Sequence, residues 1–250
     1  MNNRKAIVLA AGKGTRMFSE GNALPKVMRP ALGRPMIGYV LDALSFLPKA
    51  DTVLVVGYRQ ALVRQALGDA YPYAEQLEQR GTGHAVQCAA PLLTGFDGPV
   101  LICYGDMPLV RRATYERLFD VHARAGHACT LLSGVSNRAL PYGRVLRDAD
   151  GGFDRVVEDA DCTPAQKAVP ELNAGVYVME SAALFPALAQ LRPNNAQGEL
   201  YLTDVPALFK RQGLSVGVCA SEIPDEILGV NTPEQLAQVE ECLSAGQRLG

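Results

Sequence analysis

The stretch Ile7-Val8-Leu9-Ala10-Ala11-Gly12-Lys13-Gly14-Thr15-Arg16-Met17 decides the fold that we expect for this chain. Its apolar start is typical of a buried strand in a parallel sheet, and it runs directly into a loop with two glycines and two basic residues. Glycine lets amide groups approach an anion closely, so this strand end suits phosphate binding. The alternative is a tight strand-to-helix turn with solvated cations. The loop lacks the ending of a P-loop and the third glycine of a dinucleotide fingerprint.

Charge and composition exclude several classes of protein. Twenty-four basic and twenty-six acidic side chains leave a net charge of -2, so no overall field favours nucleic acid or an anionic membrane. No apolar segment is long enough to span a bilayer, and the short apolar stretch near the N-terminus does not predict a signal peptide. The six cysteines are widely spaced without a Cys-x-x-Cys motif, as in reduced core residues. We therefore expect a cytoplasmic protein with small-molecule substrates, and its oligomeric state is left open.

Strand and helix patterns alternate in the first half of the chain. Beyond the opening stretch, strands are predicted over 52–56 and 99–106, and helices over 37–47, 60–67, 85–93 and about 113–125. This alternation predicts an α/β fold with a Rossmann-like, mostly parallel sheet that is covered by helices on both faces. Ligands of such sheets lie at the carboxyl ends of strands.

The second half begins with shorter strand patterns separated by turn signals. Strands are predicted over 128–135, 143–147 and 153–157, within a strand insertion of about 128–172 that covers one side of the pocket. A core strand over 173–179 follows, then a helix through 191, a helix over 202–211, a strand over 214–220 and a last amphipathic helix over 233–243. We expect a single domain over 1–250.

Three charged residues are candidates for phosphate chemistry. Asp106 stands at the carboxyl end of the 99–106 strand and could anchor Mg²⁺, which needs one or two carboxylates besides phosphate oxygens. The alternative for Asp106 is an N-cap of the next helix. Lys26 could reach a phosphate as a point charge, or could be an ordinary exposed lysine. Arg16 could contact two oxygens of a leaving pyrophosphate with its planar fork.

Polar loop residues form a second group of candidates. Gln76 and the Gly81-Thr82-Gly83-His84 turn offer amide and hydroxyl groups that can bind a base edge, although a plain surface loop is the alternative. His84 is better interpreted as a structural residue than as a base, because nucleotidyl transfer needs little proton chemistry from the protein. Asn173 and Asn231, taken alone, are equally typical of caps or turns.

Taken together, these segments resemble the uridylyltransferase domain of the bacterial bifunctional enzyme that makes UDP-N-acetylglucosamine, within the sugar-nucleotidyltransferase superfamily. The glycine loop identifies only the superfamily, whereas the Asn194–Asp204 block and the Gly81–Ala85 turn are specific to the N-acetylglucosamine-1-phosphate branch. The matching motifs are Leu9–Met17, Leu24–Val27, Gly33–Met36, Gln79–Ala85, Tyr104–Leu109, Tyr142–Arg144, Val157–Glu158, Glu171–Gly175, Asn194–Asp204 and Gly229–Thr232.

The resemblance implies a nucleotide-diphospho-sugar transferase fold and a role for each matching position. Uridine would be bound by Leu9, Ala10, Ala11, Gly12, Gly14, Gln76, Gly81 and Thr82. Catalysis and phosphate contact would fall to Arg16, Lys26 and Asp106, and Mg²⁺ would be bound by Asp106 and Asn231. The sugar side would be formed by Tyr104, Gly105, Gly143, Glu158, Asn173, Tyr201, Thr203 and Asn231.

The sequence departs from the family pattern at three points. The segment Phe18–Ala23 is longer than the usual connection to Leu-Pro-Lys, and Ala160 stands where the family commonly has a lysine. The family also continues into a left-handed β-helix of hexapeptide repeats. No such repeats are present here, so we expect no acetyltransferase activity.

The resemblance implies Mg²⁺-dependent in-line transfer of a uridylyl group from UTP to N-acetylglucosamine-1-phosphate. An alternative keeps the reaction and changes the sugar or uses dTTP. Another alternative, motivated by Ala160 and the longer loop, is a nucleotide-sugar-binding protein without catalysis.

Overall fold

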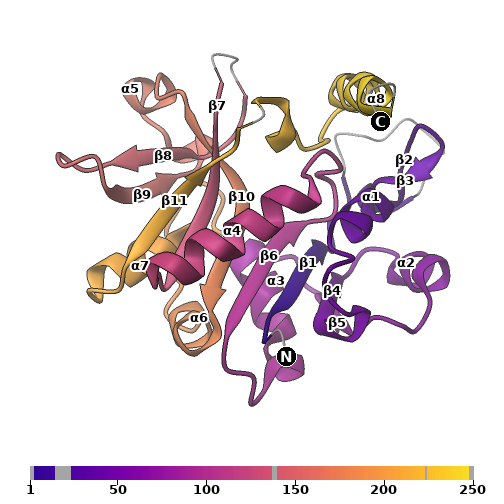
Figure 1. Ribbon diagram of the computed structural model, residues 1–250, viewed down its shortest axis with the longest axis horizontal. Coiled ribbons are helices and arrows are strands. Elements are labelled where there is room, and N and C mark those ends of the chain that lie inside the picture. Colours follow the sequence, from indigo (N-terminus) through magenta and orange to yellow (C-terminus); the bar gives the residue numbers. More distant parts are fainter. Residues whose placement is uncertain (1–2, 15–23, 137–139, 223, 248–250) are drawn as a thin grey trace.

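The computed structural model describes residues 3–14, 24–136, 140–222 and 224–247, and it contains a central sheet with helices on both faces (Figure 1). The sheet strands are β1 (Lys5–Ala10), β4 (Thr52–Val56), β5 (Tyr73–Glu75), β6 (Pro99–Tyr104), β7 (Cys129–Val135), β8 (Arg144–Arg147), β9 (Phe153–Val157), β10 (Glu171–Glu180) and β11 (Val216–Ala220). A separate two-stranded pair consists of β2 (Pro30–Ala31) and β3 (Arg34–Pro35).

The α-helices connect these strands. They are α1 (Met36–Ala43), α2 (Gln60–Leu67), α3 (Thr82–Ala89), α4 (Arg112–Ala125), α5 (Pro164–Lys167), α6 (Ser181–Leu188), α7 (Asp204–Arg211) and α8 (Pro233–Gln247). Short 3-10 helices are η2 (Lys26–Met28), η3 (Lys49–Asp51), η4 (Ala90–Leu93), η5 (Asp159–Asp161) and η6 (Pro224–Ile227).

The strand order is β11-β7-β10-β6-β1-β4-β5, and β8 and β9 extend from β10. Strand β1 pairs in parallel with β4 and with β6, and β4 pairs in parallel with β5. Strand β11 pairs in parallel with β7. Strand β10 runs antiparallel to both β6 and β7. This order confirms the predicted mostly parallel, Rossmann-like sheet.

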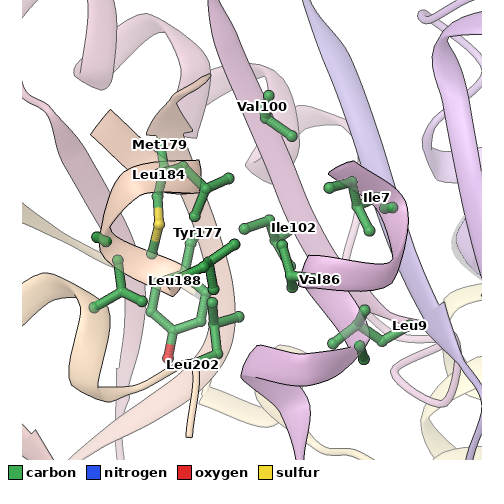
Figure 2. Packing of buried hydrophobic residues seen from close by; sticks show 14 of the residues in the cluster. Ile7, Leu9, Val86, Val100, Ile102, Tyr177, Met179, Leu184, Leu188 and Leu202 are labelled. Carbon is green, nitrogen blue, oxygen red and sulfur yellow. The ribbon is translucent and has the colours of Figure 1, made fainter. Parts of the chain in front are cut away.

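The two faces of β1 explain its uninterrupted apolar sequence. Ile7 and Leu9 pack toward α3 and α6, whereas Ala6 and Val8 pack toward α1 and α4 on the opposite face. Successive side chains of a strand point to opposite faces, so a strand covered on both sides must be apolar throughout. Figure 2 shows the first face, where Ile102 of β6 lies against side chains of the covering helices.

Several elements differ from their predicted bounds. Strand β7 belongs to the main sheet, between β10 and β11, and of the strands that the structure describes within 128–172, β8 and β9 lie off the main strand order. Helix α1 ends at Ala43, and the turns that follow keep Leu44 and Leu47 buried without extending the helix. Helix α3 begins at Thr82, before its predicted start, and is followed by η4 from Ala90. Strand β5 was not predicted, because its three residues are too few to show a strand pattern.

The C-terminal helix α8 packs near β2, at the end of the molecule where α1 lies (Figure 1). Its start is fixed by Thr232 and Gln235, since the Gln235 amide donates to Thr232 Oγ1 and the Gln235 side chain accepts from the Thr232 amide. The helix continues to Gln247, past the predicted end at Leu243. Within the described ranges, no helix has the length and apolar character needed to cross a membrane.

We expect Ile102→Ala to reduce the free energy of unfolding by about 2–5 kcal/mol, because it deletes a completely buried side chain between β6 and its covering helices. Urea unfolding would measure the change. Val135→Ala is the matched control, because Val135 is 57% exposed at the end of β7. A loss at Ile102 no larger than the loss at Val135 would contradict the packing.

Candidate functional site

Two cavities lie beside each other at the carboxyl ends of β1 and β6. The glycine-loop cavity, of about 390 Å³, is lined by Leu9, Ala11, Gly12, Val27, Gln76, Gln79, Gly81 and Ala85. The β10 cavity, of about 310 Å³, is lined by Met107, Pro141, Tyr142, Gly143, Glu158, Asn173, Ala174, Gly175, Tyr201, Gly229 and Asn231. Both cavities are also lined by Lys26, Thr82, Tyr104, Asp106, Gln197 and Glu199. Two ligands bound in these cavities would therefore meet at this shared wall.

Strand register brings the glycine loop and Asp106 to the same edge of the sheet. Leu9 of β1 is paired with Tyr104 of β6, and the Gly105 amide donates to the Leu9 carbonyl at 3.0 Å. Strand β1 ends at Ala10 and β6 ends at Tyr104, so both strands end at or just beyond this pair. Asp106 is not an N-cap, because α4 begins only at Arg112.

Lys26 lies between two oxygen-bearing side chains at the shared wall. Its ammonium forms an ion pair with Asp106 and donates a 2.7 Å hydrogen bond to Asn231 Oδ1. The Lys26 and Asp106 side chains are only 15% and 13% exposed. Asn231 comes from the segment between η6 and α8, which is held here because the Val230 amide donates to the Asp106 carbonyl at 3.0 Å. Two segments that are far apart in the sequence thus both contact the ammonium group of Lys26.

Gly14 packs directly against the side chain of Lys26. Its φ is +65°, and a Cβ at this position would lie 2.8 Å from the Cβ of Lys26. A side chain at Gly14 would therefore force the lysine stem away from Asp106.

The donor set around Lys26 fits a hard divalent cation. The Asp106 carboxylate and the Asn231 amide oxygen both contact one positive charge, and oxygen ligands of this kind suit Mg²⁺. The part of the chain that the structure describes holds no group of three or more His, Cys, Asp or Glu residues able to bind a metal. A Mg²⁺ ion on these two side chains would need further oxygens from substrate or water.

The Gly81 turn is joined to the segment 199–203, in which Glu199 lines both cavities and Tyr201 lines the β10 cavity. Gly81 has φ of +107°, and a Cβ there would lie 2.6 Å from the Leu200 carbonyl oxygen. Only glycine fits this approach without displacing the backbone. The joining hydrogen bonds are Leu200 N to Arg80 O (2.8 Å), Gly83 N to Leu200 O (2.7 Å) and Leu202 N to Thr82 Oγ1 (3.0 Å).

Polar groups in the β10 cavity are held by their neighbours. Glu158 Oε1 accepts a 2.9 Å hydrogen bond from the hydroxyl of Thr203. Burial raises the pKa of Glu158 above its ordinary value, although the Thr203 hydrogen bond opposes the shift. The side chain of Asn173 donates from Nδ2 to the Tyr177 hydroxyl at 2.7 Å, and the backbone N–H of Asn173 donates to the Gly143 carbonyl.

Most predicted site residues line the cavities, and a few do not. Ala10 packs on the opposite face of the sheet, because it alternates with Leu9 and Ala11 along the strand. Gly105 is buried against Val27 behind the cavity wall. Gly14 and Thr203 also line neither cavity, although Gly14 lies against Lys26 and Thr203 donates to Glu158, and Arg16 is outside the described residues.

Sequence reasoning missed four polar residues of the site. Gln197 and Glu199 line both cavities, and Gln79 donates from Nε2 to the Ala11 carbonyl at 2.8 Å. The Tyr142 hydroxyl accepts a 2.7 Å hydrogen bond from the Gly229 amide and so supports the segment that carries Asn231. All four lie within motifs used for the resemblance, but the motifs do not reveal which members face a cavity.

A family model described as the MobA-like NTP transferase domain matches residues 6–207, which makes the chain a nucleotidyltransferase, and the fold with its paired cavities agrees with that class. The chain belongs to this family.

Its relatives include several proteins named bifunctional protein GlmU. The chain is 43% identical over 238 residues to the one from Pelotomaculum thermopropionicum, which covers 95% of this chain and 51% of that protein. It is 45% identical to the protein from Heliobacterium modesticaldum, with 97% and 52% covered, and 47% identical to that from Pelobacter propionicus, with 97% and 53% covered. The chain thus spans about half the length of these curated relatives. The matches confirm the family resemblance inferred from the motifs.

We expect Glu158→Gln to raise the melting temperature near pH 7. Because the folded-state pKa of Glu158 is raised, folding favours its protonated form, and the wild type loses stability as pH rises through that pKa. Glutamine keeps an acceptor for Thr203 and carries no charge. The melting temperatures of the variant and the wild type, measured from pH 4 to pH 8, should therefore converge as the pH falls below the ordinary glutamate pKa of about 4.3.

Glu234→Gln is the control for this comparison. The pKa of exposed Glu234 is lowered by a hydrogen bond to Thr232, so the same substitution there should give no gain near pH 7. A pH-independent difference between the Glu158 variant and the wild type would contradict the assignment.

Proposed function

We propose that the chain transfers a uridylyl group from UTP to N-acetylglucosamine-1-phosphate and releases UDP-N-acetylglucosamine and pyrophosphate. The observation that carries this proposal is that the two cavities meet at Lys26 and Asp106. The Lys26 ammonium there contacts both the Asp106 carboxylate and the side-chain oxygen of Asn231. Membership of the NTP transferase family supports the reaction class. The choice of sugar rests on the resemblance of the Asn194–Asp204 block and the Gly81 turn to the N-acetylglucosamine branch, and these two motifs are hydrogen bonded to each other.

In the proposed reaction, an oxygen of the sugar phosphate forms a bond to the α-phosphorus of UTP, and the bond from that phosphorus to the bridging oxygen breaks. The electron pair leaves with pyrophosphate. The attacking oxygen is already anionic, so no protein base is required. Lys26 would offset the repulsion between the two anions, and Asp106 with Asn231 would bind Mg²⁺. Bound Mg²⁺ would supply charge neutralisation and orient the phosphate oxygens.

The two cavities would take different parts of the substrates. Gln76, Gly81 and Thr82 would bind the uracil and ribose, together with Leu9, Ala11 and Gly12. Glu158 and Asn173 would bind sugar hydroxyls on the other side, near Gly143 and Tyr201. Ala160 lies in η5 and carries no charge, and the basic residue among the described lining of the β10 cavity is Lys26. We infer that Lys26, together with Mg²⁺ at Asp106 and Asn231, would supply the positive charge for the sugar phosphate here.

Pyrophosphate release tests the proposal directly. The protein would be assayed with UTP, dTTP or CTP against N-acetylglucosamine-1-phosphate and glucose-1-phosphate, with and without Mg²⁺. We expect release with UTP, N-acetylglucosamine-1-phosphate and Mg²⁺ together. Release with another pair only would replace the substrate assignment, and binding of UDP-N-acetylglucosamine without any release would replace catalysis by a binding function.

Asp106→Asn should lower turnover about 100- to 1,000-fold, because it removes the negative charge that anchors the cation at the reacting phosphates. The fold should be unchanged, since asparagine has the same shape. Asp120→Asn is the matched control on a half-exposed residue of α4 that pairs with Arg4, and it should keep full activity. An Asp106 variant with turnover near that of the control would refute the metal assignment.

Lys26→Met should lower turnover and strengthen metal binding. The Lys26 ammonium and a divalent cation would use the same two oxygens, so removal of the ammonium leaves Asp106 and Asn231 free for the ion. Free Mn²⁺ measured by paramagnetic resonance, in protein without substrates, reports the affinity independently of activity. Lys13→Met in the glycine loop is the control. Mn²⁺ affinity that is unchanged or weaker in the Lys26 variant would argue against a shared site.

A further inference from the structure

The side-chain amide of Gln76 is held in one orientation at the glycine-loop cavity. Its Nε2 donates to the Gly81 carbonyl at 3.0 Å and faces Nδ1 of His84 at 3.2 Å. The Gly81 carbonyl also accepts from the Ala85 amide in the first turn of α3. A carbonyl oxygen cannot donate, so the reversed amide would press Gln76 Oε1 against the Gly81 oxygen. The nitrogen must therefore face Gly81 and His84.

The same contact defines the protonation of His84. Nδ1 meets an N–H group and must accept from it, so the neutral ring carries its proton on Nε2. That Nε2 lies 3.8 Å from the sulfur of Cys88, one turn further along α3. The imidazole is thus fixed between Gln76 and Cys88, with one nitrogen assigned to each.

These bonds use both hydrogens of the Gln76 amide. Gln76 is 5% exposed and lines the glycine-loop cavity. Its Oε1 forms no hydrogen bond within the described part of the chain. The polar atom that Gln76 can offer to a ligand is therefore an acceptor, and His84 helps to exclude the arrangement in which it would offer a donor.

We propose that His84 is a positioning residue that sets base specificity by fixing the Gln76 amide. The inference rests on the proposed function, in which a uracil base enters the glycine-loop cavity. Uracil presents an N3–H donor between two carbonyl oxygens, and Gln76 Oε1 can accept from it. Cytosine presents an N3 lone pair at that place, which would face the Gln76 oxygen without a hydrogen between them. A mismatched polar pair of this kind discriminates more strongly than shape alone.

The test compares the affinities for UTP and CTP by calorimetry in four proteins. The wild type should prefer UTP. In His84→Leu the amide loses one of its two fixed partners, and the ratio of UTP to CTP affinity should fall about tenfold. In His84→Asn the side-chain oxygen can replace Nδ1 as the acceptor, so the ratio should return toward the wild-type value. His127→Leu changes a histidine that hydrogen bonds to Thr130 in β7, outside both cavity linings, and should leave both affinities unchanged.

The outcomes separate the two proposals. A wild-type protein without a preference for UTP contradicts the proposed function. A wild type that prefers UTP, together with an unchanged ratio in His84→Leu, overturns only the role of His84. Steady-state kinetics of His84→Leu give a second measurement, because a Gln76 amide that is no longer held in place should raise KM for UTP more than it lowers kcat.

The tautomer can also be measured without any substitution in the pocket. Long-range proton–nitrogen NMR of the wild-type protein distinguishes Nε2–H from Nδ1–H rings, and the other two histidines, His122 and His127, can be assigned from their own variants. An Nε2–H ring at His84 supports the proposal, and an Nδ1–H ring overturns it even if His84→Leu fails to fold.

Discussion

The contact of the Lys26 ammonium with Asp106 and Asn231 is the constraint on which the site depends. A charge removed from water is costly unless it is paired, so this partly buried lysine needs both oxygen acceptors close by. The acceptors come from the residues just after β6 and from the segment before α8. The sheet register that aligns β1 with β6, and the backbone hydrogen bond from Val230 to Asp106, serve to bring these parts together.

A second set of contacts makes the two cavities parts of one site. The Gly81 turn and the segment around Leu200 and Leu202 are joined through backbone groups and the Thr82 hydroxyl. Thr82 lines both cavities, so a displacement of either segment would reshape both binding surfaces. The same turn supplies the carbonyl that orients Gln76, which connects the closure of the pocket with the presentation of a base acceptor.

The balance of charge around the β10 cavity is unusual for a site that is proposed to bind a sugar phosphate. Asp106, Glu158 and Glu199 line it, and Lys26 is the basic residue among its described lining. Burial already raises the pKa of Glu158, which indicates that its charged form is poorly stabilised there. In the proposed reaction, a divalent cation at Asp106 and Asn231 would offset this surplus of carboxylates.

The sequence alone was sufficient for β1, β6, the glycine loop and an aspartate at the rim of the sheet. A strand buried on both faces must be an apolar run, and the carboxyl ends of parallel strands share one edge. Only the tertiary structure decided that Lys26 lies between Asp106 and Asn231, that Ala10 faces away from the cavity and that His84 orients Gln76. The physical reason is that these facts depend on the direction of each side chain and on hydrogen-bond partners set by three-dimensional packing, whereas periodicity along the chain reports only local burial and turns.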